Sequence, residues 1–378
     1  MKLLLVSAFY EAHKGGIERV AGALARALVA RGVAVHWLAA DASPPPEPGP
    51  GPGPQSAARL TTDPIPAWNG IERRLGVPVP IWGFGGWRRL RRALRDVDAV
   101  MLHDTLYVGN ILAYLAAKLA RKPIMIVQHV GPIAFSNPLL RVIMALGDRL
   151  VGRSMLARAD QVVFISQTTA DAFDSVRFRT APALIFNGVD TEMFYPEDAR
   201  PLPSRPLVLF SGRFVERKGL DVVAALARAR PDVDFHLAGW GPMDPAAWGL
   251  PNVTSATIAG RAEMRDLYRA ADLVILPSIG EGFPLVIQEA LATGTPVICA
   301  TETMAADPAL DGVIDHAPVD LTDIPGTAAA WTRVLDDALA RARAEDHGAR
   351  LDRAGFAAAR YGWTATVSRY QDLLARLG

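Results

Sequence analysis

The chain has 378 residues, 50% of them hydrophobic, with 40 basic side chains against 39 acidic ones. One hydrophobic core rarely serves a chain of this length, so we expect two domains. The near-zero net charge excludes a dedicated nucleic-acid-binding protein, which would carry a strong basic excess. A single cysteine, Cys299, excludes an internal disulfide, and no cysteines and histidines have the spacing of a metal site, so we expect no metal.

Hydrophobic stretches indicate the compartment. None approaches the about 18 to 20 uninterrupted apolar residues that a membrane-spanning helix needs. The segment Met1–Tyr10 is apolar, but it lacks the small-residue cleavage site of a signal peptide and is followed by Glu11, so we interpret it as a first strand. These features predict a cytoplasmic protein.

Short apolar strands alternate with longer amphipathic helical stretches, the pattern of parallel sheets covered by helices on both faces. The first half predicts strands at 2–7, 34–39, 99–102, 124–128, 161–165 and 183–186, and helices at 17–31, 107–120 and 139–159. The second half predicts strands at 207–210, 234–238, 253–258, 273–276 and 296–300, and a last helix at 363–377.

Proline marks two irregular segments. Four prolines within 195–206 predict a linker at 196–206 between a domain 1–195 and a domain 207–362. The proline- and glycine-rich run 44–54 predicts a polyproline-like or disordered stretch within a loop that reaches residue 69.

Two glutamates lie eight residues apart in the stretch Gly280–Leu291, across a strand-to-helix junction. An apolar strand precedes the loop, and a helix with Pro284 in its first turn follows it. Glu281 is therefore expected at the helix N-terminus and Glu289 about two turns further on. Carboxylates accept hydrogen bonds from hydroxyls and terminal amides bind anions, which suits a nucleotide sugar. The alternative is an ordinary helix with two acidic residues.

The run E-G-F-P-L-V-I-Q-E-A-L-A-T-G-T-P-V resembles the E-x7-E segment of the retaining glycosyltransferases of family 4, the group 1 enzymes with the GT-B fold. The resemblance implies two Rossmann-like domains that face each other across a cleft, with the final helix, 363–378, crossing back to the N-terminal domain. It implies that Glu281 contacts the transferred sugar and Glu289 the ribose. The further donor-binding residues of this segment would be Gly282, Phe283, Leu285 and Val286.

A second motif lies between Ser211 and Asp221, after a strand and at the start of a helix. Arg213 and Lys218 can clamp a diphosphate from two sides; a solvated charge run is the alternative. The segment resembles the family's G-R-x-x-x-x-K-G, in which both cations bind the diphosphate and stabilise the leaving group, so no metal or other cofactor is expected. Gly239 and Gly241 match the family's G-x-G-P and would border the nucleoside pocket.

The first half offers further candidates. Gly15 and Gly16 form a turn at a helix start, where amides can bind phosphate oxygens, although a simple turn is the alternative. His103 and His129 each end a strand, at the edge where open α/β sheets bind ligands. The resemblance implies that His129 contacts the sugar near the reacting carbon. It also implies that His103 with Asp104 faces the acceptor; a purely structural histidine is the alternative.

Residues 81–95 combine Trp82 and Trp87 with five arginines at 88–95 over a predicted helix. Such a segment fits an anionic bilayer, while an exposed helix whose tryptophans join the core is the alternative. Residues 139–158 add four arginines along another amphipathic stretch. Bilayer contact would place the protein at the inner face of the cytoplasmic membrane and favour a lipid-linked acceptor.

We therefore predict a retaining, metal-independent hexosyltransferase with catalytic residues His129, Glu281, Arg213 and Lys218. It would move a sugar from a UDP- or GDP-sugar to a lipid-linked or cell-envelope glycan. By resemblance, substitution would occur on one face of the sugar, with the leaving phosphate helping to deprotonate the acceptor. A nucleotide-sugar epimerase and a catalytically silent nucleotide-sugar-binding protein are the alternatives.

Overall fold

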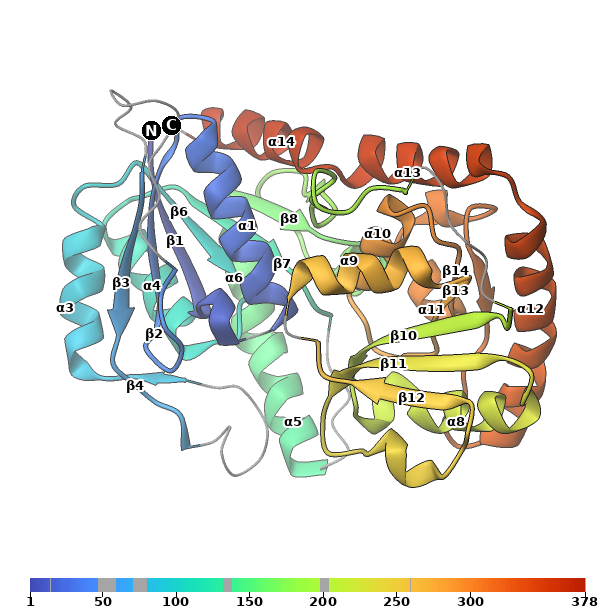
Figure 1. Ribbon diagram of the computed structural model, residues 1–378. Coiled ribbons are helices and arrows are strands. Elements are labelled where there is room, and N and C mark those ends of the chain that lie inside the picture. Colours follow the sequence, from blue (N-terminus) through green and yellow to red (C-terminus); the bar gives the residue numbers. More distant parts are fainter. Residues whose placement is uncertain are drawn as a thin grey trace. The chain divides into compact units, whose positions relative to one another are not determined.

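The computed structural model describes residues 1–13, 15–46, 59–70, 80–131, 138–197, 204–258 and 260–377 (Figure 1). Most of the proline- and glycine-rich run, and part of the predicted linker, lie outside these residues. Contacts divide the chain into two compact units. The first is Met1–Gly188 with Trp363–Gly378, and the second is Val189–Gly362.

The first unit is built on a parallel sheet. Among the described residues it has seven strands in the order β3-β2-β1-β6-β7-β8-β9. They are β1 (Lys2–Phe9), β2 (Ala34–Ala40), β3 (Leu60–Ile65), β6 (Ala99–His103), β7 (Ile124–Gln128), β8 (Gln161–Phe164) and β9 (Ala183–Leu184). The longer helices are α1 (Gly16–Ala30), α3 (Phe84–Ala93), α4 (Val108–Leu119), α5 (Pro138–Gly147) and α14 (Trp363–Ala375). Shorter elements are η1 (Glu11–His13), α6 (Arg153–Arg158), α7 (Gln167–Asp171) and the antiparallel pair β4 (Ala67–Trp68) and β5 (Ile81–Trp82).

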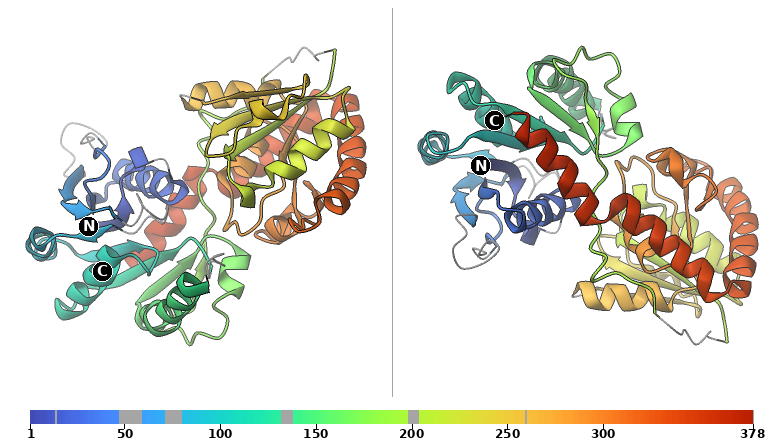
Figure 2. Two further views of the ribbon diagram at one scale, coloured as in Figure 1. Left: turned by 90° about the horizontal axis from the view of Figure 1, so that it is seen from below. Right: turned by 90° about the horizontal axis from the view of Figure 1, so that it is seen from above.

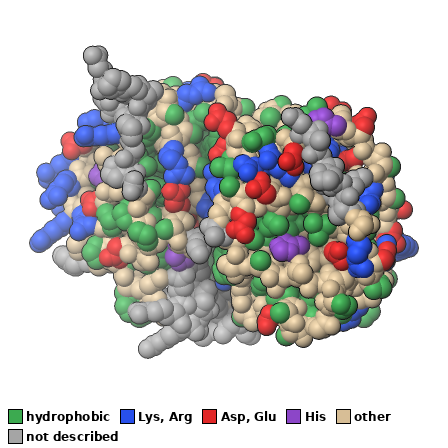
Figure 3. Space-filling model, in the orientation of Figure 1, with side chains coloured by type: hydrophobic (Ala, Val, Ile, Leu, Met, Phe, Trp, Pro, Cys, Tyr) green, Lys and Arg blue, Asp and Glu red, His purple; other side chains and the backbone are tan. Residues whose placement is uncertain are grey.

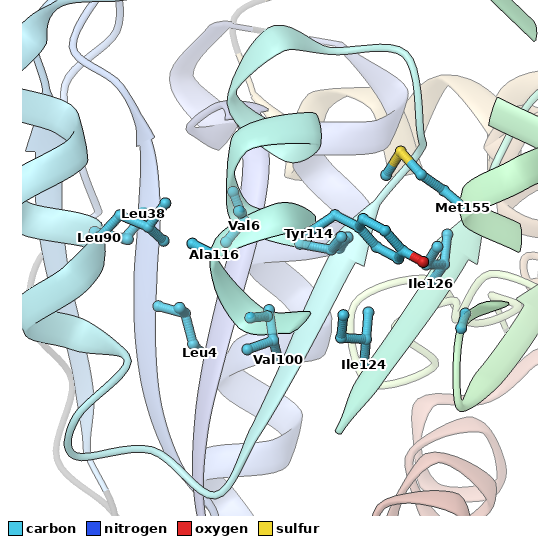
Figure 4. Packing of buried hydrophobic residues seen from close by; sticks show 14 of the residues in the cluster. Leu4, Val6, Leu38, Leu90, Val100, Tyr114, Ala116, Ile124, Ile126 and Met155 are labelled. Atoms are coloured by element: carbon cyan, nitrogen blue, oxygen red, sulfur yellow. The ribbon is translucent and has the colours of Figure 1, made fainter. Parts of the chain in front are cut away.

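The core of the first unit lies on the central strands. Leu4 and Val6 of β1 are fully buried, and Figure 4 shows them among apolar side chains of β6, β7, α3, α4 and α6. A parallel strand covered on both faces needs apolar residues on both of its sides, which explains why the β1 sequence is almost continuously hydrophobic. The rigid sheet fixes the positions of the strand ends that carry His103 and His129.

Two parts of the first unit differ from expectation. β3 forms inside the segment predicted as a loop, because Leu60 and Ile65 are buried and the strand pairs with β2 at the sheet edge, where Pro64 is tolerated. The helix predicted at 139–159 is continuous from Pro138 to Arg158, but its central segment, η2 (Asp148–Gly152) between α5 and α6, is π-helical.

The two tryptophans of the segment 81–95 pack against the core of the first unit. Trp82 is only 7% exposed, and Trp87 is half-buried against the same core. Helical spacing turns Trp87 and Leu90 toward the sheet, so the tryptophans add to the core and are not available as a pair to a bilayer. Of the five arginines, Arg89 forms an ion pair with Asp63 at 2.9 Å and the other four are exposed.

The second unit repeats this architecture. Its described residues form a six-stranded parallel sheet in the order β12-β11-β10-β13-β14-β15. The strands are β10 (Leu207–Arg213), β11 (Asp234–Trp240), β12 (Val253–Ala256), β13 (Leu273–Leu276), β14 (Val297–Ala300) and β15 (Asp315–Ala317). The helices are α8 (Leu220–Ala229), α9 (Arg261–Ala270), α10 (Leu285–Ala292), α11 (Thr301–Met304), α12 (Ile324–Ala344) and α13 (His347–Tyr361), with 3-10 turns η3 (Glu216–Lys218), η4 (Pro245–Trp248) and η5 (Pro308–Leu310).

The chain passes between the units at Gly188 and Val189, earlier than the predicted linker 196–206. Asp190 forms an ion pair with Arg261 at 3.2 Å, and the Tyr195 ring lies under the Arg269 guanidinium. These side-chain contacts attach residues 190–195 to the second unit. The division between the units therefore precedes the proline-rich segment.

The final helix, α14, belongs to the first unit. It lies beside α1 (Figure 2, right), and the Gln371 side chain donates to the Arg31 carbonyl oxygen at 3.2 Å. Arg369 donates to the Leu184 carbonyl oxygen of β9 at 2.6 Å. None of the described helices is long and apolar enough to cross a membrane.

Candidate active site

The loops that follow β10 and β11 lie directly against each other. Gly212 and Gly239 are register partners in these strands, and a Cβ on Gly239 would collide with the Gly212 carbonyl oxygen. A Cβ on Gly241 would likewise collide with the carbonyl oxygen of Phe214. Both glycines of the G-x-G-P segment are therefore required for backbone packing. Their place beside a nucleoside stays a prediction.

The loop after β10 is joined to the loop after β13. Gly219 follows Lys218 and has a φ of +70°, in the left-handed region, and a Cβ there would collide with the Pro277 carbonyl oxygen. The backbone N–H of Ile279 donates to the carbonyl oxygen of Arg217 at 3.0 Å. These backbone contacts bring the cationic motif to the loop that carries the first glutamate.

Lys218 and Glu281 form an ion pair of 2.7 Å between Nζ and Oε1, and both side chains are largely shielded from solvent. Arg217 lies 3.4 Å from the same carboxylate oxygen but is mainly exposed. Arg213, exposed at the end of β10, has no ion pair with the described residues. The structure thus unites Lys218 with Glu281 and leaves Arg213 available to an anion.

Glu289 is held by a residue that the sequence did not indicate. Its Oε2 accepts a hydrogen bond of 3.0 Å from the hydroxyl of Tyr268 on α9. Tyr268 is fully buried, and its own carbonyl oxygen accepts from Thr295 at 2.7 Å. A tyrosine in the middle of an amphipathic helix carries no signal for this role, because its contact depends on how α9 packs on α10.

The N-terminus of α10 differs from expectation in one respect. Pro284 is the N-cap, with φ of −67° and ψ of 129°, and the helix begins at Leu285. The amides of Leu285 and Val286 have no intrahelical partner, so Pro284 removes only its own N–H and leaves these two helix-terminal donors in place. Phe283 is buried, with its ring centroid 5.4 Å from that of Tyr361, so its side chain anchors the loop in the core. Gly282 is half-buried beside it.

In the first unit, three predicted residues meet at the ends of β6 and β7. His103 Nδ1 lies 2.8 Å from His129 Nε2, and the backbone N–H of His129 donates to Asp104 Oδ1 at 2.7 Å. Asp104 has a φ of +66°, and the Asn110 side chain donates to the carbonyl oxygens of His103 and Asp104, at 2.5 and 2.8 Å. Asn110 thus stabilises an unfavourable backbone turn.

Burial keeps the two histidines of this cluster uncharged. It lowers the pKa of His103 to about 3, and burial followed by the neighbouring His103 lowers the pKa of His129 well below its usual value. Burial also raises the pKa of Asp104 to about 7. Neutral histidines share one proton in their mutual hydrogen bond, so each restricts the other's tautomer. Among the described residues, His103 Nε2 and Asp104 Oδ2 are buried without a hydrogen-bond partner.

The glycine turn at α1 contains a buried carboxylate. Gly15 is the N-cap of α1, and a Cβ on it would collide with the Glu18 side chain, which folds back over the turn. Glu18 is 5% exposed and also contributes to the raised pKa of Asp104. Gly16 faces open space. An incoming phosphate at this turn would meet the Glu18 carboxylate, a contact that the glycine pattern of the sequence does not indicate.

No group of three or more histidine, cysteine, aspartate or glutamate side chains in the described part of the chain could hold a metal ion. Contacts within each unit join several of the predicted residues into one set per unit. One comprises Lys218, Glu281 and Glu289 in the second unit, and the other comprises His103, Asp104 and His129 in the first.

Comparisons with known proteins agree with this architecture. A family model described as Glycosyltransferase Family 4 matches residues 14–193, and one described as Glycosyl transferases group 1 matches residues 205–337. The D-inositol 3-phosphate glycosyltransferase of Mycolicibacterium smegmatis is 31% identical over 302 residues, which cover 71% of this chain. The chain spans 65% of that relative's length, just under two thirds.

Two solved structures match the whole chain. Sucrose-phosphate synthase from Thermosynechococcus elongatus has a TM-score of 0.70 at 21% identity, covering 100% of this chain and 99% of that one. Anabaena HepE in complex with UDP has a TM-score of 0.71 at 17% identity, covering 100% of both chains. The predicted GT-B fold class is confirmed. The chain belongs to the family 4, group 1 glycosyltransferases.

Proposed function

We propose that this protein transfers a sugar from a nucleoside diphosphate sugar to an acceptor hydroxyl, with retention at the anomeric carbon and without a metal ion. The observation that carries the proposal is the ion pair of Lys218 and Glu281 at the N-terminus of α10, with Glu289, about one turn into the helix, fixed by Tyr268. A cation and two carboxylates around helix-terminal amides match the phosphate and hydroxyl groups of one nucleotide sugar.

The charged residues indicate how the nucleotide-sugar donor would bind. Arg213 and Lys218 bind the diphosphate, and the transfer of the Lys218 ammonium to phosphate oxygens frees Glu281 to accept hydrogen bonds from the sugar. Glu289 accepts hydrogen bonds from the ribose hydroxyls. HepE has been solved in complex with UDP and with UDP-glucose, which supports a UDP-sugar as the first donor to test.

The reaction breaks the bond between the anomeric carbon and the diphosphate and forms one to the acceptor oxygen on the same face. The acceptor proton passes to the leaving phosphate, and the two cations stabilise the charge that develops there. His129 is neutral and uses Nε2 toward His103, so Nδ1 is its nitrogen for a substrate hydroxyl.

We further propose a lipid-linked or cell-envelope glycan as the acceptor, and action at the inner face of the cytoplasmic membrane. Relatives such as the M. smegmatis protein are named for D-inositol 3-phosphate, so phosphorylated polyols belong in the acceptor panel.

Thermal shift against UDP-, GDP- and ADP-sugars tests the donor site, with Arg213→Ala and Lys218→Ala beside the wild type. Arg217→Ala is the matched control, because this neighbouring arginine is mainly exposed. Stabilisation by one donor that is lost in the first two variants and kept in the control supports the proposal. No stabilisation of the wild type by any donor would contradict it.

Product analysis separates the alternatives. Nucleotide release that depends on an acceptor, an unchanged anomeric configuration by NMR and full activity in EDTA support retaining, metal-independent transfer. Release of an altered free sugar without any acceptor would favour an epimerase. Donor binding without turnover, across the acceptor panel, would favour a silent binding protein.

A further inference from the structure

One helical face of the first unit carries large aliphatic side chains in solvent. Val142, Ile143 and Leu146 of α5 are 56%, 54% and 52% exposed, and Leu150 of η2 is 68% exposed. Spacings of one, four and eight residues place them on one side of the helix. We call these four side chains the α5 face. Isolated exposed apolar residues are common, but four on one face mark an interaction surface.

The segment is anchored at its other end. Asp148 is buried and forms an ion pair with Arg153 at 3.1 Å, and the Arg153 guanidinium lies 5.2 Å from the centre of the Phe173 ring. Arg153 also donates to Ser175 Oγ at 2.7 Å. The exposed side chains of the α5 face therefore remain outside the core although the C-terminal end of the segment is firmly attached. Figure 1 shows the ribbon of α5 extending away from the first sheet.

Charge on the same segment selects the kind of partner. Arg141 and Arg149 are exposed in the same segment as the apolar residues, and the one acidic residue from 141 to 150 is Asp148, which is buried against Arg153. Aliphatic side chains beside exposed cations fit a bilayer of anionic lipids, with the chains among acyl groups and the guanidinium groups at phosphates. Self-association through this face would bring like-charged arginines together, because symmetric interfaces repeat the same patch.

We propose that the α5 face docks the protein on an anionic lipid bilayer. The inference rests on the proposed function in one respect, since it supplies the route to a lipid-linked acceptor. It replaces the contact expected from Trp82 and Trp87, whose side chains belong to the core. The docking depends both on insertion of the apolar side chains and on the charge of the two arginines, so neither the apolar side chains nor the arginines alone account for it.

Vesicle flotation tests the proposal with the full-length protein. The wild-type protein should bind to vesicles that contain phosphatidylcholine and phosphatidylglycerol. It should bind much less to vesicles of phosphatidylcholine alone. The double variant Ile143→Gln/Leu146→Gln should reduce the bound fraction by about tenfold or more. Arg141→Gln/Arg149→Gln should lower binding to anionic vesicles by roughly tenfold and remove its dependence on salt.

The matched control is Leu115→Gln/Leu119→Gln on α4. These leucines are 51% and 80% exposed and have the same four-residue spacing, but nearby Lys118 and Lys122 donate to backbone carbonyl oxygens at 2.6 Å each. The control should bind vesicles like the wild type. Circular dichroism confirms that each variant is folded.

Three outcomes would overturn the inference. One is equal vesicle binding by wild type and the α5 double variant. Another is equal binding to neutral and anionic vesicles. The third is a wild-type dimer in light scattering that the α5 double variant converts to monomer, because it would show that a second copy covers the face. UDP-sugar binding measured on the same samples tests the donor site separately, so vesicle docking and the proposed function can fail independently.

Discussion

Lys218 and Glu281 form an ion pair of 2.7 Å although they lie on loops after two different strands, β10 and β13. The pair links the cation proposed for the diphosphate to the carboxylate proposed for the sugar. An anionic ligand must compete with Glu281 for the Lys218 ammonium, so the pair sets the charge balance of the donor site.

Glu281→Gln separates binding from turnover. The amide no longer holds Lys218 by charge, so UDP should bind as tightly as to wild type or more tightly, while turnover should fall by about 10²-fold or more through loss of the sugar contact. Calorimetry with UDP and steady-state assays measure the two effects. Undiminished turnover would refute the role assigned to Glu281.

Tyr268→Phe tests the support of Glu289. Loss of the 3.0 Å hydrogen bond should cost about 1 kcal/mol in nucleotide binding, roughly a fivefold weaker Kd, because Glu289 loses its fixed orientation. Isothermal titration with UDP measures the change. Glu289→Gln should bind UDP more weakly still. An unaltered Kd for UDP in both variants would exclude a nucleotide contact through the Glu289 carboxylate.

Gly219→Ala tests the backbone that positions Lys218. The variant combines a left-handed φ with a collision against the Pro277 carbonyl oxygen, so the free energy of unfolding should fall by more than about 2 kcal/mol. Gly249→Ala is the matched control: its φ is +64° with open space around the Cβ position, and it should cost only about 1 kcal/mol. Thermal unfolding compares them. Equal losses would show that the packing against Pro277 contributes nothing.

Stability should depend on pH through the buried histidines. At pH values below 6.5, the usual histidine pKa, His103 and His129 stay neutral in the folded protein and gain protons only on unfolding. The free energy of unfolding therefore decreases as the pH falls. Asp104, with its pKa raised to about 7, acts in the opposite direction between pH 3.8 and about 7. Two histidines against one aspartate leave a net loss that grows as the pH falls below 6.5 and approaches one proton, roughly 1 kcal/mol per pH unit, near pH 5.

His103→Gln should reduce by one the number of protons taken up on unfolding, so the stability of the variant should depend less on pH. Chemical unfolding at about pH 6.5 and about pH 5 should then show a loss of more than about 1 kcal/mol in wild type and almost none in the variant. Parallel curves for the two proteins would mean that His103 titrates normally in the folded state.

Much of the fold followed from local patterns. Apolar runs bounded by turns predicted strands such as Lys2–Ser7 and Leu273–Leu276 within a few residues, because buried parallel strands need continuous hydrophobic sequence. Motif spacing likewise located Lys218, Glu281 and Glu289 on loops and a helix start, as the structure has them. Their roles with a donor remain predictions.

Tertiary structure alone decided the rest. Periodicity shows that a helix has an apolar face but not what that face meets. The sequence therefore did not separate Trp82 and Trp87, which enter the core, from Ile143 and Leu146, which face solvent. Contacts between distant segments, such as Tyr268 with Glu289, depend on how helices pack on the sheet. The sequence determined which local elements and motifs form, since these depend on neighbouring residues, whereas long-range packing determined which side chains meet, are buried or remain exposed.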